Sequence, residues 1–402
     1  MNMSSTADLY CDVFSSRRTY AALLSGIAAL LLTACATKVP YQSAAPISPA
    51  PSAIVPAPLA ATPPAANAEN IAPTPLPEAA NCSQNLIFPG FPESDQQRMR
   101  DFACTLQTQY HLPPQWVLPA LYNARFNARA LALMTPPPPS PVPLRPYPWW
   151  RYRDRFLRPD RLQRGVEFWN AHRHILQQVA TKYGVSPEIL LGILNIETGF
   201  GSFQGNFRVL DANLSLALGL PARRAFFLRE SAATIELAHR LGRPVSSLRG
   251  SEAGAMGMSQ FLASSYLKYG TVWDDPPGEG LPDLWTSVPD VLASTSRFFL
   301  AHGWRPGQPV LQEASVENPV QAEQFLHGRY ALAQLTALGI RPRAGRAMPG
   351  NTPVGLLRLA TERGPRYYIA YPNFYAIMGY NPSINYSATV WAYAEALRAR
   401  VG

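Results

Sequence analysis

Hydrophobic residues recur at helical spacing over most of the chain beyond about residue 94. This pattern predicts helices over 94–110, 114–130, 162–183, 187–198, 222–241, 258–268, 287–302, 320–337 and 386–400. Within 305–380, proline and glycine interrupt the pattern, and 367–371 is typical of a short strand. The pattern therefore predicts a mainly α fold with a small β element.

The predicted helix 187–198 carries a carboxylate close to its end. Its start is marked by a Ser-Pro pair, which is typical of an N-cap followed by proline at the first helical position. Leu190, Ile193, Leu194 and Glu197 share one face, and this face should be the buried one because it carries the largest apolar residues. We therefore expect Glu197 at the edge of the core.

This placement suits Glu197 to acid catalysis. Partial burial and the negative end of the helix dipole both disfavour a carboxylate, so both should raise its pKa. A carboxyl that stays protonated near neutral pH can act as a general acid. Gly199 and Gly201 end the helix and leave room for a ligand near the backbone. A frayed helix end with a solvated glutamate fits the periodicity equally well.

Two further stretches carry candidate ligand contacts. In 251–261, small residues precede Gln260, whose amide can both donate and accept hydrogen bonds near an approaching polyhydroxylated ligand. In 379–386, tyrosines flank an Asn-Pro pair and offer stacking faces and polar edges suited to sugars. Taken singly, each stretch is more typical of a core than of a binding site.

Together these segments resemble the membrane-bound lytic murein transglycosylases of the B type, which have a lysozyme-like helical core. The resemblance covers about Tyr147 to Val401. It rests on the order and spacing of WWRYRDRF, GVEFWNAH, YGVSPEILLGILNIETGFG, RVLDANLSL, GSEAGAMGMSQFLASSY, DLWTSVPDVLASTSRFFLAHGW and NFYAIMGYNPSINYSATVWAYAEAL.

The resemblance implies a function and a set of site residues. The catalytic acid falls on Glu197, and the implied glycan-binding residues are Tyr152, Ser251, Gln260, Tyr380, Asn381 and Tyr386. The implied reaction cleaves the β-1,4 bond between N-acetylmuramic acid and N-acetylglucosamine without water and gives 1,6-anhydromuramyl ends. Two alternatives stay open on the same fold, namely a non-catalytic peptidoglycan-binding lipoprotein and a hydrolytic muramidase.

A second catalytic carboxylate is not apparent in the matching motifs. Glycosidases that use a carboxylate pair need the second group about 5 to 9 Å away. Asp211 and Glu252 are the nearest candidates in sequence. The resemblance places Asp211 in a structural segment and Glu252 where the family tolerates apolar residues, so Glu197 is expected to act alone.

The N-terminal region predicts export and anchoring. Arg17 and Arg18 precede a short apolar segment that ends in Leu-Thr-Ala before Cys35, as in a lipoprotein signal peptide, 1–35. An ordinary signal peptide with an incidental cysteine is the alternative. The Ala, Pro and Ser composition of 36–80 predicts a disordered tether. An aspartate directly after the lipidated cysteine favours retention in the inner membrane, and this chain has Ala36 at that position. We therefore expect a lipid anchor on the periplasmic face of the outer membrane.

Composition and cysteines add two expectations. The net charge of +9 suits an anionic polymer, although a solvated basic face fits as well, and no nucleic-acid motif is present. Cys82 and Cys104 would meet an oxidising exterior, where two thiols often pair. A disulfide and two free buried thiols both stay open. The implied partners are peptidoglycan strands, the membrane, and cell-wall synthesis or division proteins.

No cofactor or metal is required by this prediction. Asp275, Glu279 and Asp283 match three positions of a calcium loop that some relatives carry, but proline and threonine replace two other ligands. The folded part, 81–402, is expected to divide into an N-terminal helical part, a lysozyme-like core and a C-terminal part that completes the groove, with bounds 81–145, 146–305 and 306–402. Whether residues 82–145 cap the groove or complete the core stays open.

Overall fold

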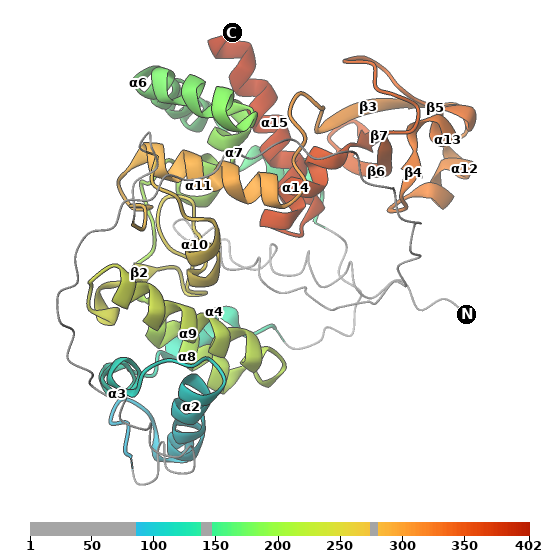
Figure 1. Cartoon of the computed structure of the whole chain (residues 1–402). Helices are drawn as coiled ribbons and strands as arrows, with labels where there is room; N and C mark the ends of the chain where they lie inside the picture. The colour runs from blue at the N-terminus through green and yellow to red at the C-terminus, as the bar shows by residue number, and fades with distance from the viewer. Residues whose placement is uncertain (1–85, 138–146, 274–279) are drawn as a thin grey trace, which may run out of the picture.

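The computed structural model describes residues 86–137, 147–273 and 280–402, and helices dominate them (Figure 1). The helices are α2 (Gln96–Thr108), α3 (Pro114–Asn123), α4 (Ala128–Met134), α5 (Trp149–Asp154), α6 (Pro159–Tyr183), α7 (Pro187–Thr198), α8 (Val209–Gly219), α9 (Arg224–Arg240), α10 (Ala263–Tyr269), α11 (Val288–Ala301), α12 (Pro319–Ala322), α13 (Leu332–Ala337), α14 (Pro372–Tyr380) and α15 (Ile384–Val401). The strands are β1 (Phe207–Arg208), β2 (Arg249–Gly250), β3 (Leu311–Val316), β4 (Tyr330–Ala331), β5 (Ile340–Pro342), β6 (Pro353–Thr361) and β7 (Gly364–Ala370). The expected mainly α fold is confirmed.

A helical body surrounds α7. Helices α6, α11 and α15 pack directly against α7, and α14 packs against α11 and α15 (Figure 1). Residues from these helices, such as Leu190, Phe299 and Tyr393, share one hydrophobic core. Burial of such large apolar side chains stabilises each helix by far more than its own helix propensity does.

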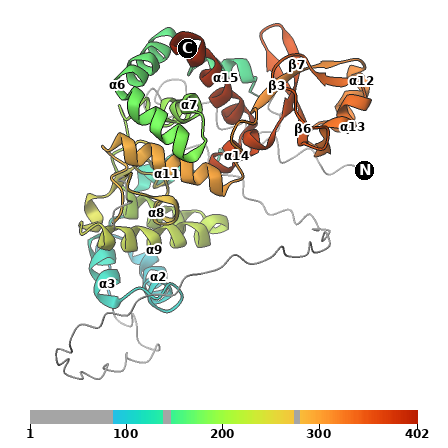
Figure 2. The ribbon, with the colours of Figure 1, turned by 45° about the horizontal axis from the view of Figure 1, so that its top comes forward.

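The N-terminal helices share a second core with α8 and α9. Met99 and Leu106 of α2 are buried in one cluster with Leu214 and Phe227. Figure 2 shows α2 and α3 on the side of α9 that faces away from the helical body. The described part of 82–145 therefore completes a core. Completing the core is one of the two roles that the sequence left open for this segment.

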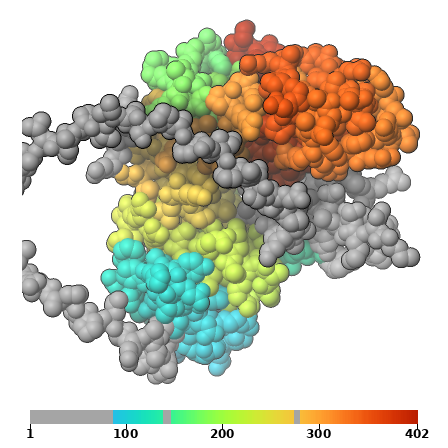
Figure 3. Space-filling model, turned by 45° about the vertical axis from the view of Figure 1, so that its right-hand side comes forward, coloured from blue at the N-terminus to red at the C-terminus, as the bar shows by residue number. Residues whose placement is uncertain are grey.

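A five-stranded antiparallel sheet forms the third part, in the order β4-β6-β7-β3-β5. Alternate residues of β6 face opposite sides, because side chains along a strand alternate. Leu357 and Leu359 join the core of the helical body, whereas Val354 and Leu356 join a separate core under α12 and α13. The sheet lobe and the N-terminal helices lie at opposite ends of the molecule (Figure 3). This sheet is the small β element that the sequence predicts.

The segment 114–130 is two helices rather than the one predicted. Ala124 is extended after α3, and the Phe126 N–H donates to the Gly90 carbonyl at 2.8 Å. This contact takes the backbone out of the helix before α4 begins. Periodicity alone does not reveal the break, because apolar residues continue through it.

The predicted helix 258–268 begins later than expected. Met256 bridges both Gly250 and Phe261 in antiparallel pairing, and Gln260 has a φ of 53°. A residue in this left-handed region cannot continue a helix. The helix therefore begins only at Ala263, and 250–261 forms a compact turn beside β1 and β2.

The predicted helix 320–337 is also wrong in part. It divides into α12, the short 3-10 turn Glu323–Phe325, β4 and α13, with His327 at a φ of 63°. The described helices α5, α8 and α14 were not predicted. Every residue of α8 from Val209 to Leu218 is buried, so its sequence has no polar face to reveal a helical period.

Cys104 forms a disulfide, so the alternative in which it is a free buried thiol is wrong. Its predicted partner, Cys82, lies outside the described residues, and the pairing stays a prediction. The signal peptide 1–35, Cys35 and the tether 36–80 also lie outside them. Among the described helices, none combines the length and the apolar character needed to cross a bilayer.

Candidate active site

Helix α7 is buried all round from Ile189 to Thr198, not on one face as the spacing predicts. Away from the predicted face, the buried amide of Asn195 is satisfied, because it accepts a hydrogen bond from Arg161 and donates one to the Phe156 carbonyl. The expected N-cap position of Ser186 is confirmed, although its hydroxyl hydrogen-bonds the side chain of Glu188 instead of the backbone.

The end of α7 is a defined cap. Gly199 has a φ of 58°, its N–H donates to the Asn195 carbonyl, and the Phe200 N–H donates to the Leu194 carbonyl. This is the pattern of a left-handed glycine cap. Glu197 is only 6% exposed. The alternative of a frayed helix end with a solvated glutamate is therefore wrong.

Thr198 joins the end of α7 to the turn 250–261. Its hydroxyl donates to the Met258 carbonyl at 2.8 Å and accepts from the Gly201 N–H at 2.8 Å. Thr198 is not among the site residues predicted from the sequence. Its position directly after Glu197, at a helix end followed by glycine, is the signal that could have identified it.

Among the described residues, one side chain hydrogen-bonds the carboxyl of Glu197. The Tyr386 hydroxyl donates to Glu197 Oε1 at 2.5 Å. Burial raises the pKa of Glu197 to about 7, and the Tyr386 hydrogen bond opposes this rise because it stabilises the carboxylate. The expected raised pKa is confirmed, with burial as its main cause. Near neutral pH the group can therefore exist in both protonation states.

Tyr152 and Tyr380 complete a ring of tyrosines around this carboxyl. Burial, and then the negative charge of Glu197, raise the pKa of both phenols. The Tyr380 hydroxyl donates to the Ser259 carbonyl, so the end of α14 is fixed to the turn 250–261. Both phenols stay neutral, and the Tyr152 hydroxyl can act as a hydrogen-bond donor, whereas the Tyr380 hydroxyl already donates within the protein.

Ser251 and Gln260 organise that turn. The Ser251 Oγ accepts from the N–H groups of Ala253 at 3.3 Å and Ala255 at 3.1 Å. Gln260 Nε2 donates to the Gln204 carbonyl at 3.1 Å and also to the Gly257 carbonyl. Gln260 Oε1 is buried without a partner among the described residues. Gln260 therefore uses its donor internally and keeps an acceptor for a ligand.

Asn381 offers the complementary group. It lies between α14 and α15, is 3% exposed, and its Oδ1 accepts from the Ser383 N–H at 3.2 Å. Its Nδ2 is buried, with no hydrogen-bond partner in the described part of the chain. Buried polar groups are normally paired, so this donor and Gln260 Oε1 are candidates for ligand contacts.

Asp211 is occupied elsewhere. Its Oδ1 accepts from the Arg125 N–H at 3.1 Å, and its Oδ2 lies 3.3 Å from Arg208 Nε. These contacts fix the N-terminal helices to α8. The carboxylate therefore has a structural partner on each oxygen.

The described residues do not assemble a calcium site. Within 86–137, 147–273 and 280–402, no group of three or more acidic, histidine or cysteine side chains could hold a metal. Asp275 and Glu279 lie outside these ranges. Asp283 Oδ1 accepts from the N–H groups of Trp285 and Thr286, so it serves as the cap of the following turn.

Comparison with known proteins identifies the class. A family model described as a transglycosylase SLT domain matches residues 94–395. Membrane-bound lytic murein transglycosylase B of Escherichia coli K12 is 37% identical over 249 residues, which cover 62% of this chain and 67% of that protein.

Two solved structures share the fold. The E. coli lytic transglycosylase Slt35 in complex with calcium matches with a TM-score of 0.65 and 32% identity, over 75% of this chain and 93% of that one. SltB3 from Pseudomonas aeruginosa in complex with NAG-anhNAM-pentapeptide matches with a TM-score of 0.66 and 27% identity, over 76% of this chain and 80% of that one.

The fold is thus that of the lysozyme-like lytic transglycosylases, as the sequence predicts. The family model covers well over half of the chain, and the chain belongs to the transglycosylase SLT domain family.

Proposed function

We propose that this protein is a peptidoglycan lytic transglycosylase in which Glu197 serves as both acid and base. It cleaves the β-1,4 bond between N-acetylmuramic acid and N-acetylglucosamine without water. The observation that carries the proposal is the buried Glu197 carboxyl, whose pKa of about 7 allows both roles near neutral pH.

Two proton transfers complete the reaction. Protonated Glu197 donates its proton to the glycosidic oxygen, and the bond from this oxygen to the muramyl anomeric carbon breaks. The carboxylate of Glu197 then accepts the proton of the muramyl six-hydroxyl as that oxygen bonds to the anomeric carbon. The products are a free hydroxyl on the leaving sugar and a 1,6-anhydromuramyl end, and Glu197 is protonated again.

An intramolecular nucleophile explains why one carboxyl suffices. A hydrolytic enzyme needs a second group to position water or to form a covalent intermediate. Asp211, one of the two candidates from the sequence, is engaged with Arg125 and Arg208. The hydrogen bond from Tyr386 stabilises the carboxylate of Glu197 between the two proton transfers.

The glycan contacts divide between two chemical types. Gln260 Oε1 and Asn381 Nδ2 supply a buried acceptor and a buried donor for sugar hydroxyl and acetamide groups. Tyr152 supplies a phenol donor beside the acid. The Tyr380 O–H is held by the Ser259 carbonyl, so its oxygen is left as an acceptor, and Ser251 shapes the turn that carries Gln260. We assign Tyr386 to Glu197 rather than to the glycan, because Tyr386 is fully buried.

Anchoring is part of the proposal. The E. coli relative is named membrane-bound, and here Cys35 would carry a lipid that holds the enzyme, through the tether 36–80, on the periplasmic face of the outer membrane. Incorporation of labelled palmitate should be lost in Cys35→Ala. Retained incorporation would disprove the anchor without affecting the catalytic proposal. Association with cell-wall synthesis or division proteins stays a prediction.

Product analysis tests the function. Purified peptidoglycan sacculi would be digested with the protein, and the fragments identified by mass spectrometry. Anhydromuramyl ends support the proposal. Reducing ends would identify a hydrolytic muramidase, and intact sacculi with bound protein would identify a non-catalytic binding lipoprotein.

A further inference from the structure

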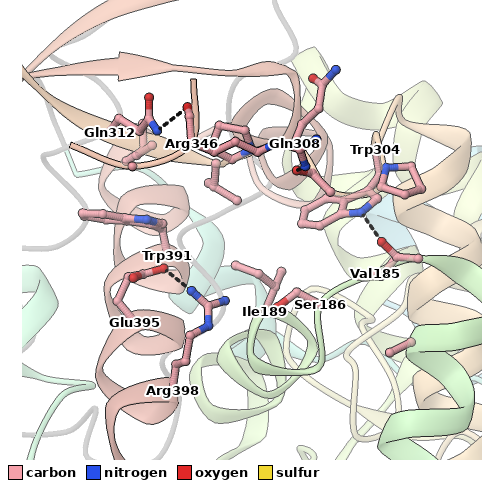
Figure 4. Close-up of a pocket in the computed structure, with 18 of the residues that line it drawn as sticks. Val185, Ser186, Ile189, Trp304, Gln308, Gln312, Arg346, Trp391, Glu395 and Arg398 are labelled. Carbon is pink, nitrogen blue, oxygen red and sulfur yellow. Dashed lines mark hydrogen bonds and ion pairs between the residues drawn. The ribbon is translucent and has the colours of Figure 1, made fainter. Parts of the chain in front are cut away.

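A pocket of about 680 Å³ lies between the helical body and the sheet, at the start of α7 (Figure 4). Ser186 and Ile189 line it from α7, and Gln312 lines it from β3. Helix α15 forms one wall and contributes Trp391, Glu395 and Arg398 in this order along the helix (Figure 4). A cavity of this size can enclose a ligand of several rings.

This pocket is separate from the candidate active site. Its lining includes none of the tyrosines around the acid, nor Glu197 itself. Ile189 is in the first turn of α7 and Glu197 in the last, about 12 Å apart at a rise of 1.5 Å per residue. The two sites therefore lie at opposite ends of one buried helix.

The pocket has an aromatic wall and an apolar base. The Trp391 ring is half-buried and meets Tyr368 edge-on at 5.7 Å, which fixes its orientation. Ile189 and Val310 add buried apolar surface beside it. A pyranose ring presents an apolar face of C–H groups, and such a face packs well on an indole.

Polar groups surround this surface. Gln308 Oε1 is buried, with no hydrogen-bond partner in the described residues, and can accept from a hydroxyl or an acetamide N–H. Arg346 is exposed at the rim, where one of its N–H groups donates to the Gly307 carbonyl and the others can reach a ligand. Glu395 offers carboxylate oxygens on the opposite wall (Figure 4).

The charges of the lining cancel. Of the described side chains that line it, Glu313 and Glu395 are acidic and Arg346 and Arg398 are basic. Arg398 is paired with Glu188 and Glu395. A site without net charge does not select a phosphate, an acidic peptide or a lipid headgroup. It favours an uncharged ligand with many hydroxyl and amide groups.

We propose that this pocket is a second binding site for N-acetylated glycan, away from the catalytic centre. The identity of the polymer rests on the proposed function, because peptidoglycan strands are the N-acetylated glycans that this enzyme meets. Binding of a second glycan segment raises the effective concentration of the strand at Glu197 and keeps the enzyme on the sacculus.

The probe is the peptide-free trimer of N-acetylglucosamine, titrated into the full chain carrying Glu197→Gln. The indole N–H resonance of Trp391, assigned by its loss in Trp391→Phe, should shift and saturate. Absence of a shift at saturating trimer would overturn the proposal. A shift caused by a sugar-free stem peptide but not by the trimer would overturn the assignment to glycan.

Retention on sacculi gives a second measurement. Trp391→Ala and Arg346→Ala should each weaken retention about tenfold. Trp391→Ala loses the contact with Tyr368 and could unfold for that reason. Arg346→Ala then still tests the proposal, because Arg346 is exposed at the rim. Tyr122→Ala is the control, because Tyr122 is 57% exposed and lies outside the pocket. Unchanged retention in both pocket variants would overturn the proposal.

The two proposals fail separately. If the Trp391 resonance shifts but no anhydromuramyl ends form, the second glycan site stands and the proposed function is wrong. If anhydromuramyl ends form but the resonance does not shift, the function stands and this site is wrong.

Discussion

The Tyr386 hydroxyl donates a 2.5 Å hydrogen bond to Glu197 Oε1, although the two residues are 189 positions apart in the chain. Both side chains are buried. Burial raises the pKa of Glu197, and the hydrogen bond lowers it, with a result of about 7. The contact therefore adjusts the group on which both proposed proton transfers depend.

Tyr386→Phe should move the alkaline limb of the activity profile to higher pH. The hydroxyl stabilises the carboxylate, so its removal raises the pKa of Glu197 further above 7. A hydrogen bond to a charged group is worth enough for a shift of about one pH unit. The pH dependence of kcat/KM on soluble peptidoglycan fragments measures this shift.

Tyr393→Phe is the matched control. Tyr393 lies on the same helix, is equally buried, and donates to the Arg161 carbonyl at 3.1 Å. This variant should lose about 1 kcal/mol of stability and leave the alkaline limb in place. An alkaline limb that stays in place or moves to lower pH in Tyr386→Phe would contradict the role given to Tyr386.

Glu197→Gln should change the pH dependence of stability. The pKa of Glu197 is raised from 4.5 to about 7 on folding, so its ionisation destabilises the folded state as pH rises through this range. Between pH 4.5 and pH 8, the free energy of unfolding of the wild type should therefore fall by about 3 kcal/mol relative to that of Glu197→Gln. Urea unfolding at both pH values measures the difference.

The exposed Glu167 provides the control for that experiment. Between the two pH values, the free energy of unfolding of Glu167→Gln should change by the same amount as that of the wild type. If Glu197→Gln also follows the wild type, Glu197 does not have the raised pKa on which the proposed mechanism depends.

The sequence predicted the helix that carries Glu197 but not the contact that adjusts it. The Ser-Pro start and the glycines after Thr198 determine the bounds of α7, and these signals are local. The hydrogen bond from Tyr386 depends on the packing of α15 against α7, which no local pattern contains. Helix α8 escaped prediction because it is buried on all sides and has no amphipathic period.

At the turn 250–261 the local sequence pattern also failed to predict a conformation that depends on tertiary contacts. Its small residues indicated a close backbone approach, but the periodicity favoured a helix that would have included Gln260. The left-handed φ of Gln260 accompanies the pairing of Met256 with Gly250 and Phe261. The side-chain amide of Gln260 also donates to the carbonyls of Gln204 and Gly257. Tertiary contacts therefore outweigh the local preference at this residue.

Asn381→Ala should weaken glycan binding more than it weakens the fold. It removes the acceptor for the Ser383 N–H and also the buried Nδ2 donor. We expect about 1 kcal/mol of lost stability and about a tenfold higher KM. Ser383→Ala is matched, because it removes one local hydrogen bond, to the Tyr386 N–H, and leaves the Asn381 donor in place. An equal rise of KM in both variants would argue against a ligand contact at Asn381.

Asp211→Asn should retain activity. Asparagine keeps an acceptor for the Arg125 N–H but loses the ion pair with Arg208, so stability should fall by about 1 to 2 kcal/mol. Specific activity at a temperature below the unfolding transition should stay within about twofold of the wild type, since the side chain takes no part in the proposed reaction. A loss as large as that of Glu197→Gln would identify Asp211 as a second catalytic carboxylate.

The central claim is that Glu197 alone serves as acid and base while the substrate supplies its own nucleophile. Digestion of sacculi in water labelled with heavy oxygen, followed by mass spectrometry, tests it most directly. The account predicts unlabelled 1,6-anhydromuramyl ends from the wild type and no cleavage by Glu197→Gln. Labelled reducing ends from the wild type, or anhydromuramyl ends from Glu197→Gln, would contradict it.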